Sequence, residues 1–246
     1  MPKPALPTLA LPALPLSGLA LAALAGCGAA PTPDALFPLA AGAEWTYKVV
    51  TIHGNQPAET ESLTLRSLGR DDLDNQATWR RRSDAGADYW LRQDETGIYR
   101  VASKSDAQRE PQPDASRRYV LRKPYAIGTQ WRADTKAYVL RRGQTGERDL
   151  RYTHPAVQMD YEIDALEQRV QTPAGRFEHC LRVKGTALLP LFVDPVAGAQ
   201  DVPLTTLEWY CPGTGLVRLE RREPAAPTAY LSGGSLTMEL SAWQQP

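Results

Sequence analysis

The chain has 246 residues, with 28 basic and 28 acidic side chains and a formal net charge of +0 at pH 7. A near-neutral chain lacks the positive field that nucleic-acid binding needs, so no nucleic-acid partner is expected. The length suits one domain or two small ones.

The first residues have the layout of a secretory signal. Lys3 supplies a positive charge, and an apolar stretch rich in Leu and Ala runs from Ala5 to Ala25. A transmembrane helix is the alternative, but it needs about 20 uninterrupted apolar residues. Three prolines interrupt the first half of this stretch. We therefore predict a cleaved signal peptide over residues 1–26.

The stretch Leu24–Cys27 resembles the lipobox of bacterial lipoproteins, whose cysteine becomes the first mature residue. The resemblance implies a diacylglycerol and an N-acyl chain on Cys27, and two chains already anchor a protein stably in a membrane. Gly28, where an Asp would favour the inner membrane, indicates the outer membrane and a domain facing the periplasm. Residues 27–35 then form a lipidated tether, and residues 36–246 a single β-rich domain.

Alternation with a period of two dominates the rest of the chain. Met159, Tyr161 and Ile163, for example, alternate with Asp160 and Glu162. One apolar and one polar face is typical of an antiparallel sheet. Candidate strands lie at 44–53, 58–68, 76–83, 87–94, 97–103, 117–123, 129–141, 157–171, 176–188, 204–211, 215–222 and 235–243. Since some of these should merge or fail, we expect about ten or eleven.

The predicted fold class is all-β, with little helix: a curved antiparallel sheet or incomplete β-barrel of about ten strands. The polar segments 104–118 and 143–156 are predicted as long loops. A short helix near 192–200 is a weaker alternative, because two nearby prolines oppose it.

A short pattern occurs twice. In residues 37–45 and again in 123–131, a proline precedes a glycine that lies three residues before Trp45 or Trp131. Coincidence is the alternative. We interpret the pattern as a repeated lead into a long strand.

Several motifs resemble an uncharacterised family of bacterial envelope lipoproteins. That family is similar to the half-barrels of the lipoprotein carrier and receptor of the Lol pathway. The resemblance implies a curved antiparallel sheet and says little about activity. The matching motifs are Phe37-Pro38-Leu39 with Gly42 and Trp45-Thr46-Tyr47, then Thr172–Phe177 with Cys180 and Val183, and finally Tyr210, Pro212-Gly213 and Gly215-Leu216-Val217.

Cys180 and Cys211 remain after removal of the signal and Cys27. An even count in an exported protein favours a disulfide between them. Two buried free thiols are the alternative. A zinc site is not expected, because no nearby histidine completes a ligand set. No metal or cofactor is therefore predicted.

No catalytic constellation stands out, so we expect a protein that is not an enzyme. The chain lacks a Gly-x-Ser-x-Gly elbow. His179 and Cys180 are neighbours on a predicted strand, so their side chains point to opposite faces. Both His179 and His154 are predicted to be surface histidines.

Charged side chains gather in two kinds of cluster. Asp160, Glu162 and Asp164 share a strand face and could hold calcium or act as an acid–base pair. Nearby basic residues, among them Arg182, instead favour a solvated, salt-bridged face. Basic groups at 80–82, 117–118 and 141–142 could contact lipid headgroups or lipopolysaccharide phosphates.

Two functional hypotheses remain. The first is a non-catalytic lipoprotein that binds a lipid or other apolar ligand in its half-barrel. The second is a structural or assembly partner of an envelope protein complex. A wide apolar cavity would favour the first, and a filled interior with an exposed apolar patch the second. The candidate ligand-lining residues, which could equally fill the core, are Trp45, Tyr47, Trp79, Trp90, Trp131 and Trp209.

Overall fold

The computed structural model describes residues 35–141, 154–196, 198–225 and 231–246. These residues form twelve strands and no helix. The predicted signal peptide, Cys27 and almost all of the predicted tether lie outside the described residues, as does most of the 143–156 loop. The strands are β1 (Glu44–His53), β2 (Glu59–Leu73), β3 (Gln76–Ser83), β4 (Asp88–Asp94), β5 (Gly97–Lys104), β6 (Gln112–Arg122), β7 (Gln130–Thr135), β8 (Val157–Thr172), β9 (Gly175–Asp194), β10 (Gly198–Cys211), β11 (Gly215–Glu223) and β12 (Gly234–Gln244).

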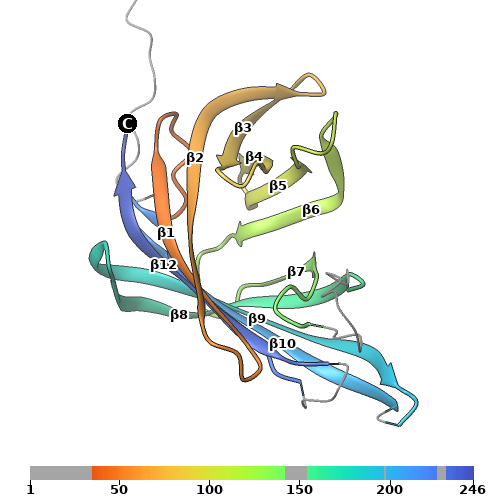
Figure 1. Cartoon of the computed structure of the whole chain (residues 1–246). Helices are drawn as coiled ribbons and strands as arrows, with labels where there is room; N and C mark the ends of the chain where they lie inside the picture. The colour runs from red at the N-terminus through yellow and green to blue at the C-terminus, as the bar shows by residue number, and fades with distance from the viewer. Residues whose placement is uncertain (1–34, 142–153, 197, 226–230) are drawn as a thin grey trace, which may run out of the picture.

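All twelve strands belong to one antiparallel sheet that curls toward a barrel (Figure 1). The order across the sheet is β6-β5-β4-β3-β2-β1-β12-β11-β10-β9-β8-β7. Strands that are consecutive in the chain are therefore neighbours, except for β6 and β7, and β1 pairs with β12 to bring the first and last strands together. β6 and β7 are the two edge strands, so the curled sheet is not closed between them. The all-β fold class is confirmed.

The strand count differs from the expected ten or eleven, because none of the twelve candidates merged or failed. Tight turns keep neighbouring strands separate. Asp74 and Asn75, with φ of 55° and 58°, reverse the chain between β2 and β3. Gly213, with φ of 72°, does the same between β10 and β11. Left-handed residues of this kind suit tight hairpin connections, here of two residues between β2 and β3 and of three between β10 and β11.

Several predicted boundaries were wrong. β5 ends at Lys104 and β6 begins at Gln112, so the loop predicted over 104–118 is limited to residues 105–111. β7 ends at Thr135 rather than at residue 141, because the backbone N–H groups beyond it bond a side chain instead of a neighbouring strand. β9 and β10 continue to Asp194 and from Gly198, so a hairpin occupies the region of the weaker helix alternative.

The core lies on one face of the sheet. Trp45, Tyr47 and Val49 are 2%, 1% and 4% exposed and alternate with more exposed neighbours along β1. Burying a large apolar side chain contributes about 1.5–3 kcal/mol. We call the face that carries these residues the inner face. No helix among the described residues is long and apolar enough to cross a membrane.

The repeated lead into a strand is present in both places, but the second strand, β7, has six residues and is not the long strand that was predicted. The N–H of Gly42 donates to the carbonyl of Ser67, and the N–H of Gly128 to the carbonyl of Ile163, both at 2.9 Å. The two glycines have φ of 84° and 87°, a conformation that favours glycine. The tryptophan three residues later is buried in both cases. The six strands β1–β6 and the six strands β7–β12 therefore begin alike.

Candidate functional site

Two of the predicted ligand-lining residues, both on β1, are held in the core by side-chain hydrogen bonds. The indole Nε1 of Trp45 donates to the carbonyl of Thr214 at 2.7 Å, and the hydroxyl of Tyr47 donates to the carbonyl of Leu216 at 2.9 Å. Burial raises the pKa of Tyr47 well above its ordinary value. These contacts fix both rings against the β10–β11 turn and the start of β11.

Trp131, on β7, lies in a different part of the inner face. It is 4% exposed, and its ring stacks on that of Tyr161 with centroids 5.7 Å apart. Burial raises the pKa of Tyr161 to about 12. Within the described part of the chain, no acceptor lies within hydrogen-bond distance of the Trp131 indole N–H. This buried donor is the feature that a polar group of a ligand could satisfy.

The remaining candidates do not share one face. Trp79 is opposite Leu91 across the β3–β4 pair, and Trp90 is opposite Arg80. Because side chains alternate along a strand, Trp90 lies on the outer face while Trp79 lies on the inner one. Trp209 is also on the outer face, where two arginine guanidinium groups lie over its ring. The six residues therefore do not form one site.

Arg81 is a buried cation that the sequence analysis treated only as part of the 80–82 basic group. It is 7% exposed, and its guanidinium carbon lies 4.1 Å from the ring centroid of Phe37 and 4.3 Å from that of Trp45. Its Nη2 donates to the carbonyl of Pro38 at 2.8 Å. Burial lowers the pKa of Arg81 to about 10. Two aromatic faces thus stabilise the charge where a carboxylate would ordinarily do so.

A second polar group on the inner face is the carboxylate of Glu208. It accepts a hydrogen bond from the hydroxyl of Tyr210 at 2.5 Å. Burial is the main cause that raises the pKa of Glu208, and Arg118 and Arg221 oppose that shift. The inner face is therefore aromatic but not purely apolar.

Among the residues that the structure describes, the most buried ion pair joins Arg221 to Glu223 near the end of β11. Their side chains are 2% and 0% exposed, and the Arg221 Nε donates to a Glu223 carboxylate oxygen at 2.9 Å. The Glu223 carboxylate also accepts the successive backbone N–H groups of residues 138–140. Sequence analysis missed this cluster, because the run of charges from 220 to 223 reads as a solvated strand end.

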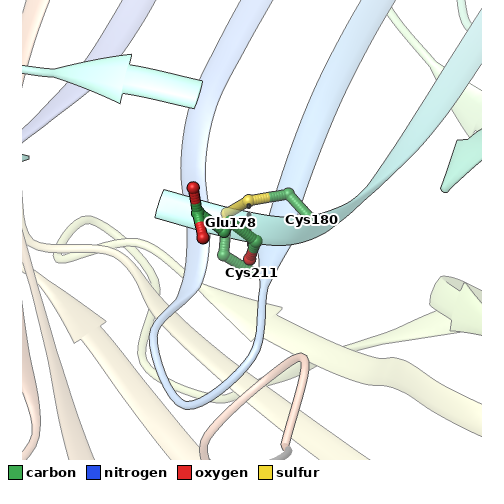
Figure 2. The surroundings of a disulfide bond; sticks show 3 residues. All are labelled: Glu178, Cys180 and Cys211. Carbon is green, nitrogen blue, oxygen red and sulfur yellow. Dashed lines mark hydrogen bonds between the residues drawn. A yellow bond between two sulfur atoms is a disulfide. The ribbon is translucent and has the colours of Figure 1, made fainter. Parts of the chain in front are cut away.

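The predicted disulfide is present. Cys180 on β9 and Cys211 at the end of β10 are joined, with their Cα atoms 4.1 Å apart. Figure 2 shows the bond with Glu178 beside it, and the Cys180 Sγ lies 3.6 Å from the Glu178 carbonyl oxygen. The bond cross-links the two strands of the β9–β10 hairpin to each other at its base.

The histidines occupy different environments. His179 is exposed and contacts the carboxylate of Glu167, which raises the pKa of His179. The surface position predicted for His179 is confirmed. The prediction for His154 was wrong, since it is 2% exposed and its Nε2 lies 3.3 Å from the carbonyl of Leu140. No group of three or more metal-ligating side chains occurs among the described residues.

The acidic strand face is salt-bridged, as predicted. Asp164 pairs with Arg182 through two contacts of 2.9 Å, and Asp160 pairs with Arg132 at 2.5 Å. Most of the basic groups also face carboxylates, so phosphate binding would have to displace existing partners. Those pairs are Arg80–Asp88 at 2.9 Å, Arg82–Asp88 at 3.2 Å, Arg117–Asp94 at 3.0 Å and Arg141–Glu59 at 3.1 Å.

Two hollows of the described surface are lined mainly by polar side chains. One of about 720 Å³ lies over β7, β8 and β9 beside the end of β6, and its walls include Arg122, Asp160, Glu162 and Lys184 together with the rings of Trp131 and Tyr161. Another of about 520 Å³ lies beside the β1–β2 turn. Neither is an enclosed apolar cavity of the kind that would hold a lipid chain.

An apolar surface lies instead on the hairpin of β9 and β10. Leu188 and Phe192 are 60% and 62% exposed, and Val196 at the tip is 98% exposed. Across the hairpin, Pro203 is opposite Leu188, and Ala199 is opposite Phe192. We call these five residues, together with Pro190, the hairpin patch.

The other side of the same hairpin is covered. Leu189, Leu191 and Val193 are buried and pack against Leu140 and Leu231. Residues 187–193 thus form an unbroken apolar run. Such a run is typical of a strand that is buried on both faces, but here only one face is buried. Figure 1 shows this hairpin extending past the other strands.

No protein-family model matches the chain, and no curated protein matches it. Two solved structures are similar over most of its length. One is a candidate lipoprotein from Parabacteroides distasonis, with 15% identity and a TM-score of 0.39 over 87% of this chain and 100% of that chain. The other is a candidate exported protein with a YmcC-like fold from Bacteroides fragilis, with 14% identity and a TM-score of 0.38 over 86% and 100%. Similarity at these TM-scores establishes neither a common fold nor a common function.

Proposed function

We propose that this chain is a non-catalytic bacterial envelope lipoprotein that acts as an assembly partner and docks onto another envelope protein through the hairpin patch. Anchoring through Cys27, and the outer-membrane location, are parts of the same proposal and rest on the Leu24–Cys27 motif. The observation that carries the docking role is the apolar run of residues 187–193, one side of which faces outward. Exposed apolar patches of this kind mark interaction surfaces.

The strand edges of the hairpin are poorly suited to accept another strand. Pro190 and Pro203 each lack a backbone N–H, and prolines at such positions protect free edges from strand addition. A partner would therefore pack onto the face of the hairpin and bury Leu188 and Phe192.

The position of the patch favours a protein over the anchoring membrane as the partner. The described chain starts at Ala35, whose carbonyl accepts a bond from the N–H of Gly213 just beyond β10. The patch lies toward the other end of β10, about 33 Å away at Pro203 and about 46 Å away at Ala199, at about 3.3 Å per residue. A tether over residues 27–35 reaches at most about 30 Å. On the proposed anchoring through Cys27, the hairpin patch would therefore be the part of the domain farthest from the attachment point.

A photo-reactive amino acid at Leu188 or Pro203 tests the docking role in the living cell. We expect the same cross-linked adduct from both positions, since both belong to one patch. Ile127 is the matched control, because it is 65% exposed but lies far along the chain from the hairpin. The adduct should be absent at Ile127 and lost when Phe192→Glu is added. Equal adducts at all three positions, or none at the hairpin, would contradict the proposal.

Ligand binding inside the barrel is the second candidate function. The buried indole N–H of Trp131 and the carboxylate of Glu208 favour an amphipathic ligand with polar groups over a purely apolar one. Native mass spectrometry of the protein purified from its host envelope tests this. A co-purified small molecule that is lost in Trp131→Phe supports it, and a clean apo mass excludes it.

A further inference from the structure

The sheet has one unpaired junction within the meander. β6 and β7 are consecutive in the chain, yet they form the two edges of the sheet. Every other pair of consecutive strands is hydrogen-bonded through its backbone. Figure 1 shows β6 and β7 facing each other without joining. We call this junction the β6–β7 seam.

Two arginines of β6 span the seam. The Arg122 Nη1 donates to the carbonyl of Gln130 at 3.1 Å, and the Arg118 Nη1 donates to the carbonyl of Asp134. The donors are four residues apart on β6, and the acceptors are four residues apart on β7 in the opposite order. This is the register of an antiparallel pair, with side chains in place of backbone donors.

The internal repeat gives the same register independently. Gln130 follows Gly128 as Glu44 follows Gly42, so the two residues occupy equivalent positions in the two halves. In the closed junction, Glu44 pairs with Gln244 at the end of β12. Arg122 is the last residue of β6, as Gln244 is the last residue of β12, so the two occupy equivalent positions in the two halves. The two junctions are therefore equivalent, but only one is closed by backbone bonds.

The two edge strands come close to each other at the seam. Cα atoms of β6 and β7 come within 8 Å of each other. Paired antiparallel strands have Cα atoms about 4.5–5.5 Å apart, and an inserted strand would need about 9.5 Å. The two edges therefore approach each other closely, yet no backbone ladder joins them.

We propose that the β6–β7 seam is a lateral gate of the barrel, opened by breaking the contacts of Arg118 and Arg122. Between the described residues of β6 and β7, opening breaks two side-chain hydrogen bonds, whereas any other junction requires a full backbone ladder to separate. It gives access to the inner face at Leu121 and Trp131, which are 0% and 4% exposed when the seam is shut. The gate is independent of docking through the hairpin patch.

Thiol labelling of the full chain with its native disulfide intact tests the gate. Leu121→Cys on β6 places a thiol behind the seam, and Val217→Cys places one at an equally buried site on β11. Each labelling rate with N-ethylmaleimide is divided by the rate of the same variant in denaturant. We expect Leu121→Cys to label at least tenfold faster than Val217→Cys. Adding Arg118→Met and Arg122→Met should raise the rate at position 121 about tenfold per contact and leave position 217 unchanged.

Equal rates at the two positions would show that both thiols are reached only by global unfolding, which would overturn the gate. Hydrogen exchange of the unsubstituted chain provides a second measurement should either cysteine variant fail to fold. Amides of β6 and β7 should then exchange faster than those of the equivalent strands β12 and β1. Equal protection of the two junctions would also overturn it.

Discussion

Replacing Glu223 by alanine removes the carboxylate that holds the chain beyond β7 in place. That carboxylate accepts the N–H groups of Val139 and Leu140 at 2.8 Å and that of Tyr138 at 3.2 Å. It also accepts the Arg221 Nε at 2.9 Å. Alanine would leave a buried guanidinium and three backbone donors without their acceptor.

The magnitude follows from this burial. Because the two side chains are 2% and 0% exposed, water cannot replace the lost carboxylate without opening the structure. Removing one partner of a buried ion pair costs about 3–5 kcal/mol of unfolding free energy. Replacing both, as in Arg221→Met with Glu223→Leu, should cost less than Glu223→Ala alone, since no charge remains buried.

Urea unfolding followed by tryptophan fluorescence measures the effect. Arg218 and Glu220 are the matched control, because they lie on the same strand with the same spacing and are 2.7 Å apart. Their side chains are 32% and 20% exposed, so Glu220→Ala should cost less than about 1 kcal/mol. If Glu223→Ala lowers the unfolding free energy no more than Glu220→Ala does, burial does not explain the contribution of the Arg221–Glu223 pair to stability.

Three further predictions concern single groups. Cys180 and Cys211 should resist thiol labelling without reduction, and their joint replacement by alanine should lower the unfolding free energy by about 3–4 kcal/mol for a separation of 31 residues; labelling of the oxidised chain would contradict this. Glu208 has a raised pKa, so its contribution to stability is present when it is protonated and is lost as pH rises through the folded pKa. Glu208→Gln should therefore stabilise the protein at about pH 8 and have little effect at about pH 4, measured by urea unfolding at each pH; an equal effect at both would refute the assignment. Cys27→Ser should abolish incorporation of labelled palmitate, and label that persists would exclude this lipid site.

The strands were predictable because alternation of apolar and polar residues reports directly which face of a sheet is buried. Met159, Tyr161 and Ile163 point inward, and their neighbours Asp160 and Glu162 point to water. The strand ends were less predictable, since they depend on contacts from distant parts of the chain. β7 stops at Thr135 because a carboxylate more than eighty residues away bonds the backbone beyond it.

The buried charges could not be predicted from the sequence. Arg81 lies between Arg80 and Arg82 in a triplet that reads as a basic surface group. Only the pairing of β3 with its neighbours turns the middle arginine inward, onto Phe37 and Trp45. The alternation along β3 predicts that the Arg81 side chain points inward. It does not predict the two aromatic rings that stabilise the buried charge.

The two halves of the barrel differ in strand length, and the difference is large in the hairpin that carries the proposed docking surface. β9 and β10 have 20 and 14 residues, against 8 and 7 in β3 and β4, the third and fourth strands of the first half. The extra length makes a hairpin whose inner side must be covered, and Leu140 supplies part of that cover. Since Glu223 holds the backbone of Leu140, the buried ion pair should also determine how firmly the hairpin is held.

This link can be measured apart from overall stability. At a temperature where both variants remain folded, Glu223→Ala should speed amide exchange in residues 187–193 and weaken cross-linking from Leu188. Glu220→Ala should do neither, because its carboxylate contacts arginines on the outer face and not the cover of the hairpin. If amide exchange in the hairpin is unchanged in Glu223→Ala, the ion pair does not stabilise the docking surface. It would then stabilise β11 only locally.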